Sequence, residues 1–141
     1  MRSKAVLDTS FIASLFFRDR FTKWSREIIK QFHHLLTIDY AYIELYNIAW
    51  KRISLFGEDK DIGLKALNYA IRFLETLEIE DFNKYLDDAL KLGLKLGIPV
   101  YDCLFLSLAL KRNALFITTD LKLVRKISKN EEIRRLILNP T

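Results

Sequence analysis

The stretch AVLDTS, residues 5–10, decides the fold of this chain, because three apolar residues end there in a carboxylate and two hydroxyls. An apolar run without alternation is typical of a central parallel strand that is buried on both faces. Asp8 would then stand at the carboxyl end of the strand, where ligands bind in open α/β sheets. Aspartate is also a favoured N-cap, so Asp8 has a second explanation as the cap of a helix that starts at Thr9 or Ser10. A functional role for Asp8 therefore depends on what the rest of the chain brings to the same place.

Apolar strands and amphipathic helices alternate along the rest of the chain. Further strands are expected over residues 35–38, 77–79, 114–118 and 136–138. Helices are expected over residues 11–17, 21–34, 40 to about 56, 62–77, 81–97, 102–112 and 121–129, with Asp39 placed to cap the third of them. Such alternation favours right-handed crossovers between parallel strands and so predicts an α/β fold. We expect a single three-layer domain over residues 1–141, with a mainly parallel central sheet flanked by helices.

Composition and charge limit the class of protein. The net charge of +5 attracts polyanions, which is a weak indication of RNA or DNA binding. The single cysteine, Cys103, excludes an internal disulfide and a cysteine-based zinc site. The basic start resembles that of a signal peptide, but the apolar run after it stops at Asp8, so we expect a cytoplasmic protein. No membrane helix is expected, because the longest apolar run, residues 98–110, contains Asp102 and is shorter than the roughly 20 residues that span a bilayer.

A second carboxylate, Glu44, lies on an apolar helix face. In the helix over residues 40 to about 56, helical spacing places Glu44 one turn from Ala41 and one turn from Ile48. An ionised carboxylate on the buried side of a helix must be paired with a cation, so a salt bridge and a metal-binding role are both open. We favour the functional role, and Asn47 shares the same face.

Two more acids stand where a strand ends or a helix begins. The run 114–118 is an uninterrupted apolar strand that leads through hydroxyls to Asp120, which repeats the pattern at Asp8. Asp102 opens a helix that is apolar almost all round and must therefore be buried. Helix capping is a second explanation for Asp102. Because the carboxyl ends of parallel strands meet at one edge of a sheet, we expect all four acids to meet there.

Four carboxylates within a few ångström of one another are not stable as four anions. Each close pair costs about 4 kcal/mol at an effective dielectric constant near 20, against a total stability of about 5 to 15 kcal/mol. Either some of the acids are protonated, with raised pKa values, or divalent cations lie among them. Hard carboxylate oxygens suit Mg²⁺ or Mn²⁺, and no histidine or cysteine is positioned to indicate zinc.

The motifs together resemble those of the PIN-domain nucleases. In chain order they are Leu-Asp-Thr-Ser at residues 7–10, Glu44 with Asn47, Tyr-Asp at residues 101–102, and Thr-Thr-Asp at residues 118–120. Each motif alone is weak, but four in the right order are fairly specific. The resemblance covers nearly the whole chain, and the length of 141 residues is similar to that of the VapC toxins of bacterial and archaeal toxin–antitoxin pairs. It therefore implies a PIN-like fold.

The resemblance also implies an activity and a set of ligands. The implied catalytic and metal-binding residues are Asp8, Glu44, Asp102 and Asp120, holding Mg²⁺ or Mn²⁺, with Thr118 supplying a supporting hydroxyl. The implied function is a metal-dependent endoribonuclease that hydrolyses RNA phosphodiester bonds, the toxin of a VapBC-type pair. A cognate antitoxin and a second copy in a homodimer are the implied protein partners. Many relatives carry another acid shortly after the last aspartate, where this chain has Leu-Lys-Leu at residues 121–123, so the number of metal ions stays open.

Other classes of protein share parts of this pattern. A nucleic-acid-binding or scaffold domain with the PIN-like fold and no turnover is the main alternative, because a fold alone does not establish activity. A haloacid-dehalogenase-like phosphatase needs a second aspartate two residues after the first, where this chain has Ser10. The first helices also carry an aromatic set that either forms a groove for an antitoxin or packs in the core. This set is Phe16, Phe17, Phe21 and Trp24.

Overall fold

The computed structural model describes residues 4–141, so the first three residues of the expected domain lie outside the described residues. Five strands form one sheet in the order β3-β2-β1-β4-β5, and every neighbouring pair is parallel. The strands are β1 Lys4–Leu7, β2 His34–Ile38, β3 Glu78–Glu80, β4 Leu115–Ile117 and β5 Ile137–Leu138. The expected parallel sheet is therefore confirmed.

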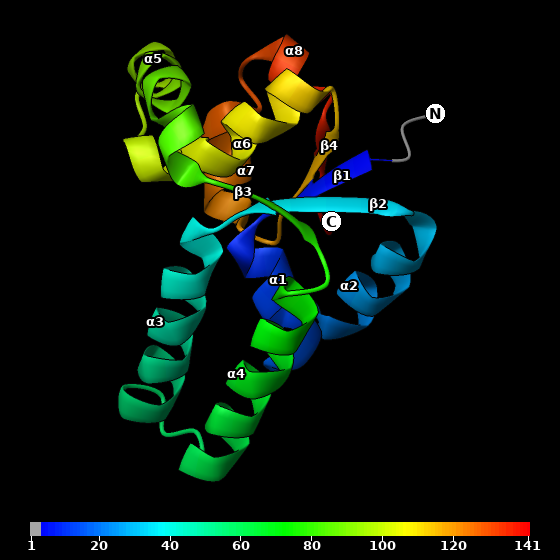
Figure 1. The fold of residues 1–141 in the computed structure, drawn as a ribbon, viewed down its shortest axis with the longest axis vertical. Helices are drawn as coiled ribbons and strands as arrows, with labels where there is room; N and C mark the ends of the chain where they lie inside the picture. Colours follow the sequence, from blue (N-terminus) through cyan, green and yellow to red (C-terminus); the bar gives the residue numbers. More distant parts are fainter. Residues whose placement is uncertain (1–3) are drawn as a thin grey trace.

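Helices cover both faces of this sheet (Figure 1). One face carries α1 to α4 and the other carries α5 to α8. The helices are α1 Thr9–Phe16, α2 Thr22–Ile28, α3 Tyr40–Ser54, α4 Lys60–Leu74, α5 Leu86–Leu96, α6 Val100–Arg112, α7 Leu121–Ile127 and α8 Glu131–Arg134. Two short 3-10 helices, η1 Ile29–Gln31 and η2 Phe82–Tyr85, precede β2 and α5. The three-layer α/β fold predicted from the alternation of strands and helices is confirmed.

The strand order creates a point of divergence at the carboxyl ends of β1 and β4. These strands are neighbours, with Leu7 paired to Ile117, yet the chain leaves them toward opposite faces of the sheet. After β1 it enters α1 on one face, and after β4 it enters α7 on the other (Figure 1). In open α/β sheets such a divergence opens a crevice where ligands bind. Asp8 and Asp120 stand at this point, one after each strand.

The centre of the core is formed by β1 and α6. Ala5, Val6 and Leu7 are fully buried, which explains the unbroken apolar sequence of β1. Residues 103–109 of α6 are all buried, and this helix packs against β1 and β2, so it needs no polar face. Within residues 4–141 no single helix is long and apolar enough to cross a membrane, and the stretches Phe82–Leu96 and Val100–Arg112 meet that length and composition only as a pair bent by 109°.

Two local expectations are wrong because residues from other parts of the chain intervene. Asp39 precedes α3 but its side chain does not cap this helix, since Oδ1 accepts a hydrogen bond from the backbone N–H of Phe82 at 3.0 Å. The helix expected over residues 21–34 ends with η1, and His34 instead begins β2, with its Nε2 lying 2.6 Å from Oε1 of Glu78 in β3. In both cases a tertiary contact overrides a preference that is local in the sequence.

The aromatic set of the first two helices packs mainly in the core. Phe17 is only 1% exposed. Trp24 meets Phe11 edge-on at 6.0 Å between ring centroids, and Phe16 lies tilted against Phe73 at 5.5 Å. Packing of the aromatic rings therefore explains three of the four members of the set.

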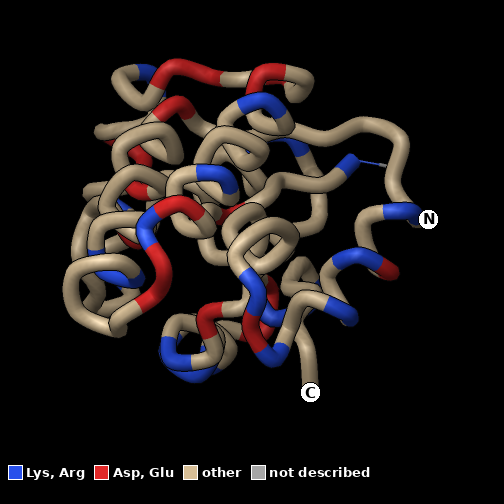
Figure 2. The backbone as a smooth tube through the Cα atoms, turned by 90° about the horizontal axis from the view of Figure 1, so that it is seen from below, with Lys and Arg blue, Asp and Glu red and all other residues tan. Residues whose placement is uncertain are grey.

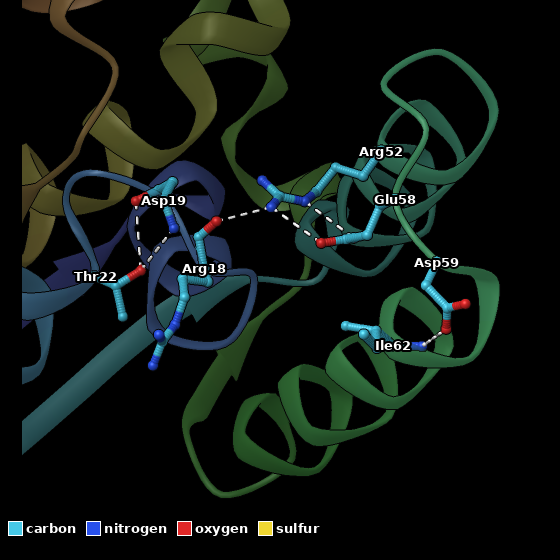
Figure 3. A network of polar contacts seen from close by, with 7 residues as sticks. All are labelled: Arg18, Asp19, Thr22, Arg52, Glu58, Asp59 and Ile62. Carbon is cyan, nitrogen blue, oxygen red and sulfur yellow. Dashed lines mark hydrogen bonds and ion pairs between the residues drawn. The ribbon is translucent and has the colours of Figure 1, made fainter.

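Arg52 ties the end of α3 to the loop after α1 and to the turn between α3 and α4 (Figure 3). Its Nε and Nη2 donate hydrogen bonds to the two carboxylate oxygens of Glu58 at 3.2 and 3.1 Å, and Nη2 also donates to the carbonyl of Arg18 at 2.8 Å. Its guanidinium lies 5.6 Å from the ring centroid of Phe17. The side chains of the ion pair are only 25% and 21% exposed, so solvent screens this pair less than a surface pair.

Replacing Arg52 with alanine is expected to lower the free energy of unfolding by about 2 kcal/mol, because bidentate charged hydrogen bonds and a backbone carbonyl contact are lost together. Arg52→Lys should recover only part of this, since an ammonium cannot form the same fork. Urea denaturation measures both. The control is Lys30→Ala, which removes an ion pair with Glu27 whose side chains are 69% and 67% exposed and should change stability little. Equal losses from the two alanine variants would contradict this view of Arg52.

Candidate functional site

Asp8 is held at the carboxyl end of β1 by hydrogen bonds to both of its carboxylate oxygens. Its Oδ1 accepts from the backbone N–H of Thr9 at 2.9 Å, so one oxygen does cap α1. Its Oδ2 accepts from the hydroxyls of Ser10 at 3.0 Å and Thr118 at 2.7 Å. Burial raises the pKa of Asp8 to about 6, the hydroxyls of Thr118 and Ser10 oppose this, and the negative charge of Asp120 adds to it. Capping alone does not explain the bonds to Oδ2, which fix the orientation of the carboxylate.

Thr118 connects Asp8 to the start of α7. Its side chain is fully buried directly after β4, and its Oγ1 accepts from the backbone N–H of Asp120 at 3.0 Å. The hydroxyl also lies 3.1 Å from that of Ser10, which accepts in turn from the backbone N–H of Thr119 at 3.1 Å. Thr118 therefore orients the carboxylate of Asp8 and fixes the backbone of Asp120.

Replacing Thr118 with valine is expected to lower the free energy of unfolding by about 1 to 3 kcal/mol, because the shape is kept while the buried N–H of Asp120 loses its acceptor. The pKa of Asp8 should also rise further, since the hydrogen bond from Thr118 lowers it. Urea denaturation measures the first effect. Thr118→Ser keeps the hydroxyl, so its free energy of unfolding should be closer to that of the native protein. A serine variant as unstable as the valine variant would show that the methyl group contributes more to stability than the hydroxyl.

Glu44 projects from the second turn of α3 toward the same place. Its Oε1 accepts a hydrogen bond from the hydroxyl of Thr9 at 2.6 Å. Burial raises the pKa of Glu44 to about 7, and the negative charges of Asp8, Asp102 and Asp120 raise it further. Among residues 4–141 no lysine, arginine or histidine forms an ion pair with it, so the salt bridge considered from the sequence does not occur there. Glu44 is thus a half-buried carboxylate surrounded by other carboxylates.

Asp102 and Asp120 complete the acidic set. Asp102 lies in the first turn of α6, whose N-cap is Pro99, so helix capping does not explain it. Its pKa is raised by burial and then by Asp120, while the positive charge of Lys126 opposes this. Asp120 does cap α7, because its Oδ1 accepts from the backbone N–H of Leu123 at 3.1 Å. Asp120 therefore combines a structural role with a place beside the other acids.

One cavity of about 520 Å³ brings the acids together. Asp8, Glu44, Asp102 and Asp120 all line it, and they come from the β1–α1 junction, α3, α6 and the β4–α7 junction. Asn47, expected on the same helix face as Glu44, lines the cavity as well. Thr118 is the one predicted site residue outside the lining. The meeting of the four acids that was expected from parallel strand ends is thus present in the structure.

The cavity also contains residues to which the sequence interpretation assigned no role. Tyr40, Lys51 and Tyr101 line it. Lys51 lies seven residues after Glu44 and Tyr40 lies four before it, so helical spacing alone places both on the same face of α3. The pKa of Tyr40 is raised first by burial and then by the charges of Glu44, Tyr101 and Asp102. The signal for Tyr101 is its position directly before Asp102.

The donor chemistry of this cavity fits a hard divalent cation. Its four acids offer only carboxylate oxygens, and the pKa values of Asp8, Glu44 and Asp102 are all raised, so a nearby positive charge would relieve their repulsion. Within residues 4–141 no three acidic, histidine or cysteine side chains lie close enough to hold an ion as they are placed. Hydroxyl groups donate to Oδ2 of Asp8 and to Oε1 of Glu44, and a backbone N–H donates to Oδ1 of Asp8. Binding of a cation would require the carboxylates to move together. Mg²⁺ and Mn²⁺ match these ligands by type.

Known proteins resemble this chain in sequence and in fold. A family model described as PIN domain matches residues 5–129. The chain is 32% identical over 125 residues to Ribonuclease VapC3 from Pyrobaculum aerophilum, covering 87% of this chain and 94% of that protein. Its fold is similar to that in a toxin–antitoxin complex from Klebsiella pneumoniae, with a TM-score of 0.68 and 15% identity over 97% of this chain and 98% of that chain. It is also similar to VapBC2 from Rickettsia felis, solved bound to a DNA fragment from their promoter, with a TM-score of 0.62 and 19% identity over 98% of this chain and 99% of that chain.

Proposed function

The chain belongs to the PIN domain family, and from this premise we propose that it is an Mg²⁺- or Mn²⁺-dependent endoribonuclease that hydrolyses RNA phosphodiester bonds. The observation that carries the proposal is the cavity in which carboxylates from four separate segments of the chain meet. The ribonuclease activity named for the relative at 32% identity supports it. A scaffold domain has no evident need for such a set, because it costs stability through mutual repulsion.

Each acid has a distinct part in the proposal. Asp8 and Asp102 would be the principal ligands, and Glu44 and Asp120 would bind the cation directly or through water. When bound, the cation would stabilise negative charge on the phosphate and lower the pKa of an attacking water. Thr118 and Ser10 hold Oδ2 of Asp8 in a fixed direction, so that this carboxylate is oriented before the substrate arrives.

Basic side chains near the cavity support binding of a phosphate backbone. Figure 2 shows lysines and arginines interspersed with acidic residues over the backbone, so the net charge of +5 is not gathered on one face. The nearest cations are therefore more informative: Lys51 lines the cavity, and Lys126 of α7 is close enough to Asp102 to lower its pKa. Binding through such contacts weakens as salt rises.

The proposal includes partners and a location. Two solved structures with the same fold hold toxin–antitoxin proteins, which supports a protein antitoxin as a partner for this chain. Exposed apolar side chains on α3, among them Ile43 at 63% and Trp50 at 55%, offer a surface on which a homodimer could form. The cytoplasm suits Cys103, a buried free thiol.

Cleavage of end-labelled structured RNAs, tRNA included, tests the proposed function. The purified protein should cut RNA with Mg²⁺ or Mn²⁺ and stop when EDTA is present. If the protein binds RNA but cuts none of it, and no inhibitor has co-purified, the non-catalytic binding domain becomes the better explanation. Cleavage that continues unchanged in EDTA would contradict the metal dependence.

A further inference from the structure

Two tyrosine rings lie in the wall of the acidic cavity. Tyr101 directly precedes Asp102 and is 53% exposed, although it lines the cavity. Tyr40 lines the same cavity from the first turn of α3. Within residues 4–141 neither ring is paired with another aromatic ring, and neither hydroxyl makes a side-chain hydrogen bond. Tyr40 packs against the core with part of its ring, whereas Tyr101 does not belong to the core packing. Neither core packing nor hydrogen bonding therefore accounts for Tyr101.

Position distinguishes Tyr101 from the other exposed aromatic residues. Tyr46 and Trp50 are exposed to a similar degree, at 58% and 55%, but neither lines the cavity. The first turn of a helix has no need of an aromatic side chain, and Tyr101 is not a cap, since Pro99 holds that position in α6. An exposed ring next to a candidate ligand of the cation points to contact with the substrate.

An aromatic ring suits this place for an electrostatic reason. The carboxylates that hold a cation also repel the phosphates of an approaching RNA. Stacking between a base and a ring does not suffer from this repulsion, and it is worth about 1 to 3 kcal/mol per base. The neighbouring Lys51 of the same cavity can then contact an adjacent phosphate.

Resting on the proposed ribonuclease function, we infer that the ring of Tyr101 stacks on an RNA base next to the cleaved phosphate, with the ring of Tyr40 forming the adjoining wall. Tyr101 is thus a positioning residue for the substrate. A base inside a duplex is covered by its neighbours on both faces, so only an unpaired base can stack in this way. Because stacking accepts every base, Tyr101 favours unpaired nucleotides without selecting a sequence.

The test uses an unpaired RNA oligonucleotide that carries one 2-aminopurine, whose fluorescence is quenched when it stacks. The fluorescent base is moved to each position in turn, and the Asp8→Asn protein is used so that the RNA stays intact. In this background Tyr101→Ala and Tyr101→Leu remove the ring, and the leucine keeps apolar bulk should the alanine variant fold poorly. Tyr101→Phe keeps the ring, and Tyr46→Ala is the matched control for an equally exposed tyrosine outside the cavity.

Quenching is expected at one position beside the cut made by the wild-type protein. Tyr101→Ala and Tyr101→Leu should lose it and bind RNA roughly 5- to 150-fold more weakly, while Tyr101→Phe and Tyr46→Ala keep it. If the wild type cleaves RNA but Tyr101→Ala binds and quenches like Tyr46→Ala, the stacking is wrong and the nuclease stands. If the wild type does not cleave but the quenching depends on the ring as expected, the nuclease is wrong, and Tyr101 stacks on bound RNA with no cleaved phosphate beside it. The stacking is also overturned if Tyr101→Phe binds RNA as weakly as Tyr101→Ala does, or if no variant binds RNA.

Discussion

Replacing Asp8 with asparagine is expected to lower the rate of RNA cleavage at least roughly hundredfold while the protein remains folded. Asparagine has almost the same shape, and its carbonyl oxygen can still accept from the backbone N–H of Thr9 and so cap α1. The negative charge of the carboxylate is lost, and with it the capacity to hold a divalent cation. The amide nitrogen that replaces Oδ2 cannot accept from the hydroxyls of Ser10 and Thr118 and must donate to them instead. The variant should still fold, because burial already raises the pKa of Asp8 to about 6 and therefore favours an uncharged side chain at this position.

Cleavage of labelled RNA with Mg²⁺ or Mn²⁺, together with a thermal melt followed by circular dichroism, measures both sides of this prediction. Asp59→Asn is the control, because Asp59 caps α4 through a hydrogen bond from the backbone N–H of Ile62 at 3.1 Å and does not line the acidic cavity. Asparagine caps a helix equally well, so this variant should cleave at the native rate. Full activity of Asp8→Asn would remove Asp8 from the proposed ligands.

The positions of Asp8 and Asp120 could be predicted from the sequence because each follows an apolar run. Once the alternation of strands and helices predicts a parallel sheet, both runs must end at the same edge. The structure places β1 and β4 side by side, which brings the two acids to the divergence of the chain. Glu44 could be predicted for a different reason, since a carboxylate on an apolar helix face is unusual.

The hydrogen bonds that orient these acids could not be predicted in the same way. The hydroxyls of Ser10 and Thr118 lie 3.1 Å apart although 108 positions separate them in the chain. No local pattern announces such a contact, because it depends on the exact placement of two strand ends. The predicted helix cap at Asp39 is wrong for the same reason. The carboxylate of Asp39 accepts a hydrogen bond from the distant backbone N–H of Phe82 instead of capping the helix that follows it.

Helical periodicity also gives an incomplete picture of which apolar residues are buried. It places Leu90 and Leu94 on one face of α5 together with Ala89 and Gly93. In the structure Ala89 and Gly93 are buried, but Leu90 is 49% exposed and Leu94 is 76% exposed. An ideal Cβ on Gly93 would lie 2.6 Å from the carbonyl oxygen of Ile98, so the close approach of the chain turns the small residues inward. Periodicity identifies the apolar side of a helix but does not show how far that side rotates into the core.

Replacing Glu44 with glutamine is expected to change activity and stability in opposite directions. Cleavage should fall at least tenfold, because a ligand of the proposed cation is lost. In EDTA at neutral pH, however, the variant should be more stable than the wild type by about 1 to 2 kcal/mol, allowing for the partial exposure of this side chain.

The pKa of Glu44 is raised to about 7 in the folded protein, against an ordinary value of 4.5, so the folded protein binds its proton more tightly than the unfolded chain does. Stability of the metal-free wild type must therefore fall as pH rises from about 4.5 to about 7, and glutamine, which does not titrate, removes this part of the fall.

Melting temperatures measured from pH 4.5 to pH 8 in EDTA decide this prediction. The wild type should lose stability across that range more steeply than Glu44→Gln, and added Mg²⁺ or Mn²⁺ should restore the wild type more than the variant, since binding to the folded state adds stability. Glu78→Gln is a control in which the effect on stability should have the opposite sign. Hydrogen bonds from Arg112 and His34 lower the pKa of Glu78 to about 2, so the charge of Glu78 stabilises the folded state above pH 4.5. Removing this charge should therefore lower the melting temperature at neutral pH. If Glu44→Gln melts below the wild type in EDTA at neutral pH, the carboxylates do not repel one another as proposed. The case for a cation among them would then depend on the cleavage measurements alone.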